Sequence, residues 1–264
     1  MTNRILALAL VATAVTAAPA IASNITPYYL FNGDASTGWQ ITNGVVTNTF
    51  STFSLGYPVA IRNTIWLGQR DDDRAVEYTL GGVATGNTSV GGDNFSQLLD
   101  GATGFAANYG VECCGATNSV TVANADWSNQ QVLFNLGTSG SGIAFDPNDS
   151  TLWISAFGGT ITHYSLAGAN LGTINLGARL MIGLAYESLT DTFWGFDRNS
   201  NNLVQFSRAG VVLADVDIPN FNPGNPFGGE MAFNGQAAVP EPATLALLGL
   251  GVAPFVRRLR RRSL

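Results

Sequence analysis

The chain has 264 residues, of which 46% are hydrophobic and only 11% are charged, and its formal net charge is −6. All 12 basic residues are arginines, and six of them lie near the two ends, so residues 23–238 hold 17 acids, six arginines and a net charge of about −11. Such an acidic segment excludes nucleic acid as a partner, because phosphates require a basic face, and it disfavours binding of the segment to an anionic lipid surface.

The N-terminal segment predicts a secretory signal peptide. Arg4 precedes an apolar run over 5–18, and Ala20-Ile21-Ala22 places small residues at the cleavage positions. We therefore predict a signal peptide over 1–22 and an exported domain over 23–238. That length suffices for one sizeable core or one large all-β domain.

Short apolar runs bounded by turn residues fill the exported domain. Examples of such runs are 64–67, 119–122, 152–154 and 202–206, with turn residues at 146–149, 157–159 and 198–201. Long helical patterns are missing, so the sequence predicts an all-β domain.

An internal repeat of 41 or 42 residues organises these runs. Residues 142–145, 150–153 and 161–168 match residues 183–186, 191–194 and 203–210, and a further strand follows at 172–176 and 211–218. Four strands in each unit predict a blade of a β-propeller, because one four-stranded sheet cannot bury both of its apolar faces alone. A β-sandwich and a β-solenoid are the alternatives.

Other copies of the unit are more degenerate. Residues 64–67 and 75–82 lie two periods before their counterparts, and we expect a copy between them with strands at 104–106, 119–122 and 131–134. Residues 230–233 resemble the first strand of one more unit, cut short, and 24–57 are expected to give a closing strand or an N-terminal elaboration.

About five units fit the exported domain, and they resemble the propellers of the NHL and strictosidine-synthase-like kind. The repeat places small residues (Gly142, Ala144) on the innermost strand, where blades crowd the axis. It also predicts that Trp153 and Trp194 fill the space between blades.

The two cysteines of the chain, Cys113 and Cys114, are adjacent. In an oxidising compartment they can form a vicinal disulfide, pair between chains or remain buried thiols, and the vicinal disulfide is a candidate. Two adjacent thiols supply too few ligands for a metal site.

Two loops are weak candidates for calcium, which prefers several oxygen ligands on a flexible loop. One candidate is the run Asp71, Asp72 and Asp73, and the other is the alternating set Asp197, Asn199 and Asn201. The second loop lacks the turn glycine and the closing glutamate of a calcium loop. An Asx-rich hairpin turn explains it without any ion, and no other cofactor is predicted.

Catalytic constellations are hard to find in the sequence. His163 is the single histidine, no Gly-x-Ser-x-Gly elbow is present, and His163 aligns with Gln205 of the next unit, so we interpret it as a polar position on a blade strand. Glu230 is the one acid placed beside a predicted innermost strand. We therefore predict no enzyme, with a calcium-dependent propeller hydrolase or lactonase as the alternative.

The C-terminal segment carries a targeting pattern. Pro240, Glu241 and Pro242 precede an uncharged run over 243–256, and Arg257, Arg258, Arg260, Arg261 and Arg262 follow. The run is short for a transmembrane helix, but basic side chains that reach the headgroups support it and would keep the arginine end cytoplasmic.

Residues 239–264 resemble a PEP-CTERM sorting signal. The resemblance implies an exported protein of a Gram-negative cell envelope or extracellular matrix, held in the inner membrane by its C-terminal helix until an exosortase-type enzyme processes it. It also implies exopolysaccharide or a surface protein as possible partners. We expect a non-enzymatic binding propeller, or a purely structural matrix component.

Overall fold

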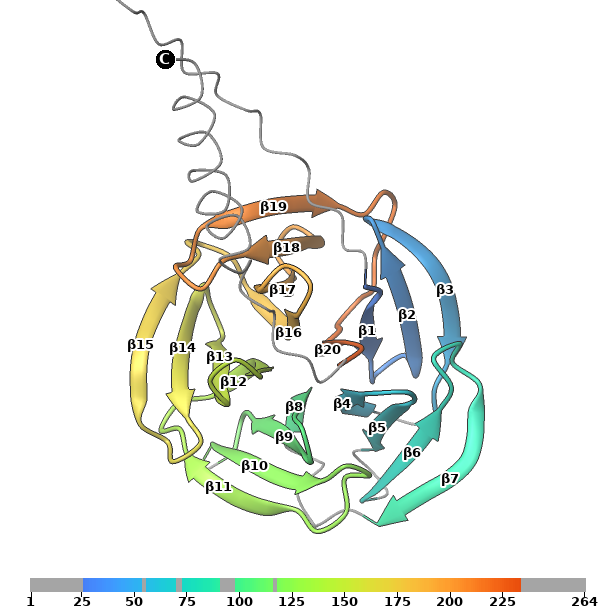
Figure 1. The fold of residues 1–264 in the computed structure, drawn as a ribbon. Helices are drawn as coiled ribbons and strands as arrows, with labels where there is room; N and C mark the ends of the chain where they lie inside the picture. Colours follow the sequence, from blue (N-terminus) through green and yellow to red (C-terminus); the bar gives the residue numbers. More distant parts are fainter. Residues whose placement is uncertain (1–25, 54–55, 70–72, 91–97, 116–117, 234–264) are drawn as a thin grey trace, which may run out of the picture.

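The computed structural model describes residues 26–53, 56–69, 73–90, 98–115 and 118–233. These residues form a five-bladed β-propeller, in which five four-stranded antiparallel sheets surround a central axis (Figure 1). The predicted all-β propeller is therefore confirmed, and the sandwich and solenoid alternatives are wrong. No helix within the described ranges is long and apolar enough to cross a membrane. The predicted signal peptide 1–22 and helix 243–256 lie outside them.

Each blade runs from an innermost strand at the axis to an outermost strand at the rim (Figure 1). The first blade consists of β20 (Gly228–Met231), β1 (Tyr28–Asn32), β2 (Thr37–Thr42) and β3 (Val45–Ser51), and the second of β4 (Gly56–Ile61), β5 (Ile65–Gln69), β6 (Arg74–Tyr78) and β7 (Ala84–Val90). The third consists of β8 (Leu98–Thr103), β9 (Ala107–Glu112), β10 (Ser119–Asn124) and β11 (Gln131–Asn135). The fourth consists of β12 (Gly140–Asp146), β13 (Thr151–Ala156), β14 (Thr160–Ser165) and β15 (Asn170–Asn175), and the fifth of β16 (Met181–Glu187), β17 (Thr192–Asp197), β18 (Asn202–Phe206) and β19 (Val212–Asp217).

The first blade closes the ring by joining distant parts of the chain. Strand β20 pairs antiparallel with β1, with Tyr29 opposite Glu230 and Tyr28 opposite Met231. The unit expected to be cut short after 230–233 is therefore completed by β1, β2 and β3. This pairing confirms that 24–57 supply closing strands.

The degenerate third blade was only half predicted. Strands β10 and β11 include the expected 119–122 and 131–134, but the expected strand at 104–106 is wrong, because these residues form the turn between β8 and β9. Both missed strands bury polar side chains, including Asp100, Asn108 and Glu112. Such residues interrupt the apolar pattern on which the prediction relied.

Large side chains fill the space between neighbouring blades, as predicted. Trp194 is fully buried among Tyr28, Leu30 and Ile41 of the first blade, and Trp153 packs beside Phe193 of the fifth blade, with ring centroids 4.9 Å apart. The small residues at the axis are also required. A Cβ atom on Gly183, whose φ is +55°, would lie 2.8 Å from the backbone of Gly229.

Candidate functional site

The buried Asp100 carboxylate accepts hydrogen bonds from three other blades at the axis. It extends from the innermost strand β8, and its Oδ1 accepts the N–H of Gly229 at 2.9 Å. Its Oδ2 accepts the N–H groups of Ile143 at 2.8 Å and of Leu184 at 3.1 Å. These donors belong to β20, β12 and β16, so one side chain connects the innermost strands of four blades.

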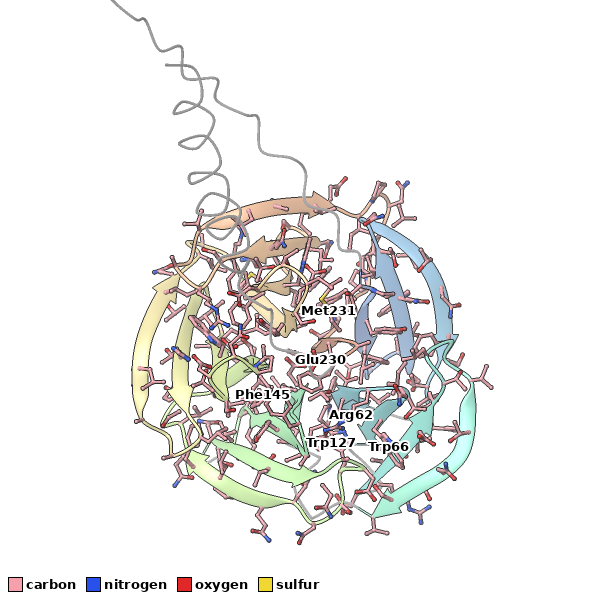
Figure 2. All side chains as sticks on the ribbon, viewed as in Figure 1. Arg62, Trp66, Trp127, Phe145, Glu230 and Met231 are labelled. Carbon is pink, nitrogen blue, oxygen red and sulfur yellow. A yellow bond between two sulfur atoms is a disulfide. The ribbon has the colours of Figure 1, made fainter. Side chains whose placement is uncertain are left out.

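Glu230 makes a similar set of contacts from β20, near the centre of the ring (Figure 2). Its Oε2 accepts the N–H of Thr103 at 2.9 Å, and its Oε1 accepts the N–H of Met231 at 2.9 Å. The Thr103 hydroxyl accepts the N–H of Ile61 at 2.7 Å, which extends the connection to β4. Together, Asp100 and Glu230 link all five innermost strands.

Burial is the main cause of the pKa shifts of Asp100, Glu230 and Tyr28 at the axis. Burial raises the pKa of the Asp100 carboxyl well above its usual range, against the N–H donors that favour its charged form. Burial also raises the pKa of Glu230 to about 8, and the pKa of Tyr28, whose hydroxyl donates to the Gly183 carbonyl. The positive charge of Arg62 partly opposes the rise in the Glu230 pKa, and Arg62 donates to the Gly104 carbonyl at 2.9 Å.

The stability of the propeller is expected to depend on pH through Glu230. The folded state binds this proton more tightly than the unfolded chain, because the pKa is about 8 in the fold and 4.5 ordinarily. The stabilisation is complete below the ordinary pKa and is lost as the pH rises through 8. We expect the free energy of unfolding to fall by roughly 2–3 kcal/mol between pH 6 and pH 8.

Urea denaturation at pH 6, 7 and 8 measures this dependence. Glu230→Gln, which resembles the protonated side chain, should remove most of the change in the free energy of unfolding with pH. If this free energy changes equally with pH in the wild type and the variant, the assignment to Glu230 is contradicted.

The carboxyl groups of Asp100 and Glu230 accept hydrogen bonds from the backbone of the innermost strands. Their oxygens face N–H donors, whereas a calcium ion requires oxygens that face the ion. The described part of the chain contains no group of three or more His, Cys, Asp or Glu side chains that could hold a metal. Sequence reasoning identified Glu230 but missed Asp100. The available signal was an acid directly after the apolar pair Leu98-Leu99.

The calcium candidates are not brought together. Asp71 and Asp72 lie outside the described residues, and Asp73 is an exposed turn residue with φ of +48°. In the second loop, Asp197 Oδ1 accepts the N–H groups of Leu180 at 3.0 Å and of Asn199 at 3.1 Å.

The rest of the second loop is also used for the turn. Asn199 donates through Nδ2 to the Ala178 carbonyl at 3.0 Å, and Asn201 adopts φ of +60°. This is the geometry of an Asx-rich hairpin turn.

His163 occupies a repeated structural position. It stands opposite Trp153 and stacks on it, with ring centroids 4.3 Å apart, and its Nε2 hydrogen-bonds Thr151 Oγ1 at 2.6 Å. Gln205 stands opposite Trp194 and donates to Thr192 Oγ1 at 2.8 Å. The second blade repeats the arrangement with Glu77, opposite Trp66 and bonded to Thr64 at 2.7 Å. The second, fourth and fifth blades thus each combine a Thr-x-Trp segment with one polar partner, which explains the match between His163 and Gln205.

A charged network that sequence reasoning missed joins the fourth and fifth blades. The Arg208 guanidinium binds both carboxylate oxygens of the buried Asp146 and donates through Nε to Asp191 Oδ1 at 3.0 Å. Asp191 also accepts the Tyr186 hydroxyl at 3.0 Å. Because the partners lie up to 62 positions apart, no local pattern in the sequence indicated them.

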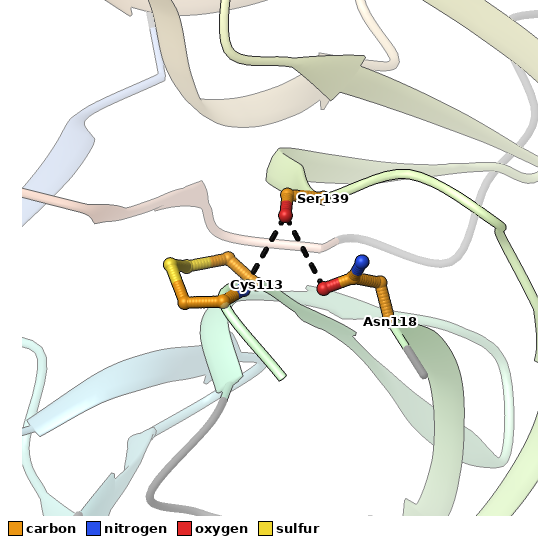
Figure 3. The surroundings of a disulfide bond; sticks show 4 residues. Cys113, Asn118 and Ser139 are labelled. Carbon is orange, nitrogen blue, oxygen red and sulfur yellow. Dashed lines mark hydrogen bonds between the residues drawn. A yellow bond between two sulfur atoms is a disulfide. The ribbon is translucent and has the colours of Figure 1, made fainter. Parts of the chain in front are cut away.

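Cys113 and Cys114 form the predicted vicinal disulfide, at the turn after β9 (Figure 3). Cys113 is buried against Tyr57 and Leu99, whereas Cys114 is exposed and adopts φ of +66°. The Cys114 N–H donates to Ser139 Oγ at 3.4 Å. The bridge therefore fixes one turn next to the start of the innermost strands.

A family model for the PEP-CTERM protein-sorting motif matches residues 238–262. This chain is therefore an exported protein with a motif that exosortase-type enzymes process, and the five-bladed propeller precedes that motif. The predicted signal residues Pro240 to Arg262 lie outside the described part of the chain. No curated protein matches the chain.

One comparison with a TM-score above 0.5 supports the propeller fold, and two further solved structures give lower scores. A chain of a nidogen–laminin complex is 13% identical, with a TM-score of 0.54 over 77% of this chain and 84% of that chain. Virginiamycin B lyase from Staphylococcus aureus is 15% identical, with a TM-score of 0.46 over 77% and 73% of the two chains. Glutaminyl cyclase from Myxococcus xanthus is 12% identical, with a TM-score of 0.49 over 74% and 76%. At these identities the likeness concerns the fold alone.

Proposed function

We propose that this protein is a non-enzymatic binding propeller of a Gram-negative cell envelope, which its C-terminal signal directs to the cell surface or the matrix. The observation that carries the proposal is the use of Asp100 and Glu230. These acids occupy the axis, where the hydrolase alternative would need ligands for calcium, and they hold N–H groups of the innermost strands instead. Matrix polysaccharide and other surface proteins are the proposed partners, and a purely structural matrix role is the alternative.

The position of the sorting motif indicates which side of the propeller faces the membrane. The described chain ends at Phe233, whose N–H donates to the carbonyl of Ile61 at the end of β4. The motif begins at residue 238. Each residue between Phe233 and the motif spans at most about 3.5 Å. The side of the ring on which the innermost strands end therefore lies close to the processing site. The opposite side is then presented outward.

Neutralising the five tail arginines tests the sorting part of the proposal. In a host with an exosortase-type enzyme, changing Arg257, Arg258, Arg260, Arg261 and Arg262 to glutamine is expected to abolish the processed form, because the cytoplasmic charge that orients the segment is lost. Immunoblots of cell fractions measure the processed and unprocessed chains. Changing the same positions to lysine keeps the charge and should preserve processing. Normal processing of the glutamine variant would contradict the proposal.

A glycan array with the purified chain tests the binding part. Binding to one or more matrix polysaccharides is expected. Failure to bind any of them would favour the structural role, and hydrolysis of a bound polymer or a lactone would favour the enzyme.

A further inference from the structure

A groove of about 430 Å³ opens on the second blade, beside the end of the first blade's outermost strand. Phe53, Gln69, Arg74, Val76, Ala84 and Thr88 line it. Its volume falls within the range of small-molecule sites, about 300–1,000 Å³.

The groove exists because one face of strand β7 carries very small side chains. Alternate residues of a strand point to opposite faces, and Ala84, Gly86 and Thr88 share the groove face. A Cβ atom on Gly86 would meet nothing within 4 Å. On the other face, Thr85 and Asn87 hydrogen-bond Glu77 at 2.8 and 2.7 Å, so β7 is held in place while the groove face stays hollow.

An aromatic ring borders the groove on a fixed backbone. Phe53 is 60% exposed, yet its N–H donates to the Tyr78 hydroxyl at 2.8 Å and its carbonyl accepts Gln69 Nε2 at 2.8 Å. Tyr78 and Gln69 are both buried. Two buried polar side chains therefore fix the backbone of Phe53. Its ring lies 6.4 Å from the Tyr78 ring, between centroids, and keeps most of its surface exposed.

Arg74 adds a hydrogen-bond donor that the described residues leave unpaired. No ion pair or hydrogen bond joins its guanidinium to another residue within the described ranges, and the residue is exposed. Arg179 and Arg208, in contrast, are paired with carboxylates. A free guanidinium beside an aromatic face can donate several hydrogen bonds to a ligand that stacks there.

We propose that this groove binds a sugar ring of a neutral polysaccharide. The apolar C–H face of the sugar stacks on Phe53, and its hydroxyl groups accept hydrogen bonds from Arg74 and exchange them with Thr88. The acidic charge of the exported domain disfavours a polyanionic chain. This inference rests on the proposed binding function and gives it a ligand class and a location.

Binding of neutral and uronic-acid tetrasaccharides to the full-length chain, in a detergent without a sugar headgroup, tests the groove. Isothermal titration should detect binding of at least one neutral tetrasaccharide. Phe53→Ala is expected to weaken it by about tenfold, equivalent to ~1.4 kcal/mol. Ala84→Leu, which fills the hollow face, should weaken it at least as much, and Arg74→Gln should have a smaller effect. Phe157→Ala is the matched control, since Phe157 is an exposed phenylalanine outside the groove, and it should bind as the wild type does.

The outcomes separate this inference from the proposed function. Loss of binding in Phe53→Ala and Ala84→Leu but not in Phe157→Ala supports the groove. Wild-type affinity in both groove variants overturns the groove but leaves a binding propeller. Preference for uronic-acid chains overturns the neutral ligand class. If no saccharide binds the wild type, both the groove and the polysaccharide partner are wrong. Circular dichroism of each variant shows whether the fold is retained.

Discussion

Replacing Asp100 with alanine is expected to lower the free energy of unfolding by about 3–5 kcal/mol. The change leaves the N–H groups of Gly229, Ile143 and Leu184 without their acceptor at a buried position. Each unsatisfied buried donor costs about 1–3 kcal/mol. Removal of a buried carboxyl also removes the cost of desolvating it, so a loss near the lower end of the summed range is expected. Urea denaturation followed by circular dichroism measures the change.

Asp217→Ala is the matched control for this prediction. Asp217 is an exposed acid on the outermost strand β19, and surface changes of this kind usually alter stability by less than about 0.5 kcal/mol. Equal losses in the free energy of unfolding for the two alanine variants would show that the Asp100 hydrogen bonds do not stabilise the ring.

Trp194→Ala should lower the free energy of unfolding by a similar amount, about 3–5 kcal/mol. Trp194 is fully buried between the fifth and first blades, and its truncation leaves a cavity at the closure of the ring. It also leaves Glu187 Oε2, which accepts the indole N–H at 2.8 Å, with only the Thr190 hydroxyl as partner. Among the residues that the structure describes, the neighbouring Glu187 Oε1 already has no hydrogen-bond partner.

Two further variants separate packing from hydrogen bonding at this position. Trp194→Phe keeps most of the ring and should lose less stability than Trp194→Ala. Trp153→Ala, at the equivalent position one unit earlier, should lose a comparable amount, because Trp153 is nearly as buried. A loss below about 1 kcal/mol in both alanine variants would mean that these residues do not fill the cores between blades.

The sequence was sufficient to predict the propeller, because the repeat is encoded locally. The matches between 142–145 and 183–186 place small residues at the axis, and Trp153 and Trp194 recur in the same register. In the third blade the same logic failed. Asp100 accepts hydrogen bonds from other blades, and Asn108 bonds both Arg62 of the second blade and the Ala125 carbonyl of its own blade. These buried polar residues interrupt the apolar pattern of their strands.

The axial site was less accessible to prediction than the fold. Glu230 could be placed because it adjoins a recognisable innermost strand. Asp100 could not, since its three partners come from residues 43, 84 and 129 positions away. The acidic loops were ambiguous in the sequence for a different reason. The alternating oxygens of Asp197 and Asn199 suit a calcium loop and an Asx turn equally, and in the structure these residues make the contacts of an Asx turn.

Because β20 closes the ring, the exported chain can complete its fold only after this last strand has crossed the membrane. Strand β20 is among the last described segments to leave the membrane, yet it occupies the centre of the molecule and supplies Gly229 and Glu230 to the axial contacts. Earlier blades can form as they emerge, but they stay an open arc until residue 231 is outside. A chain released before this point would stay unclosed and would expose apolar blade faces to proteases.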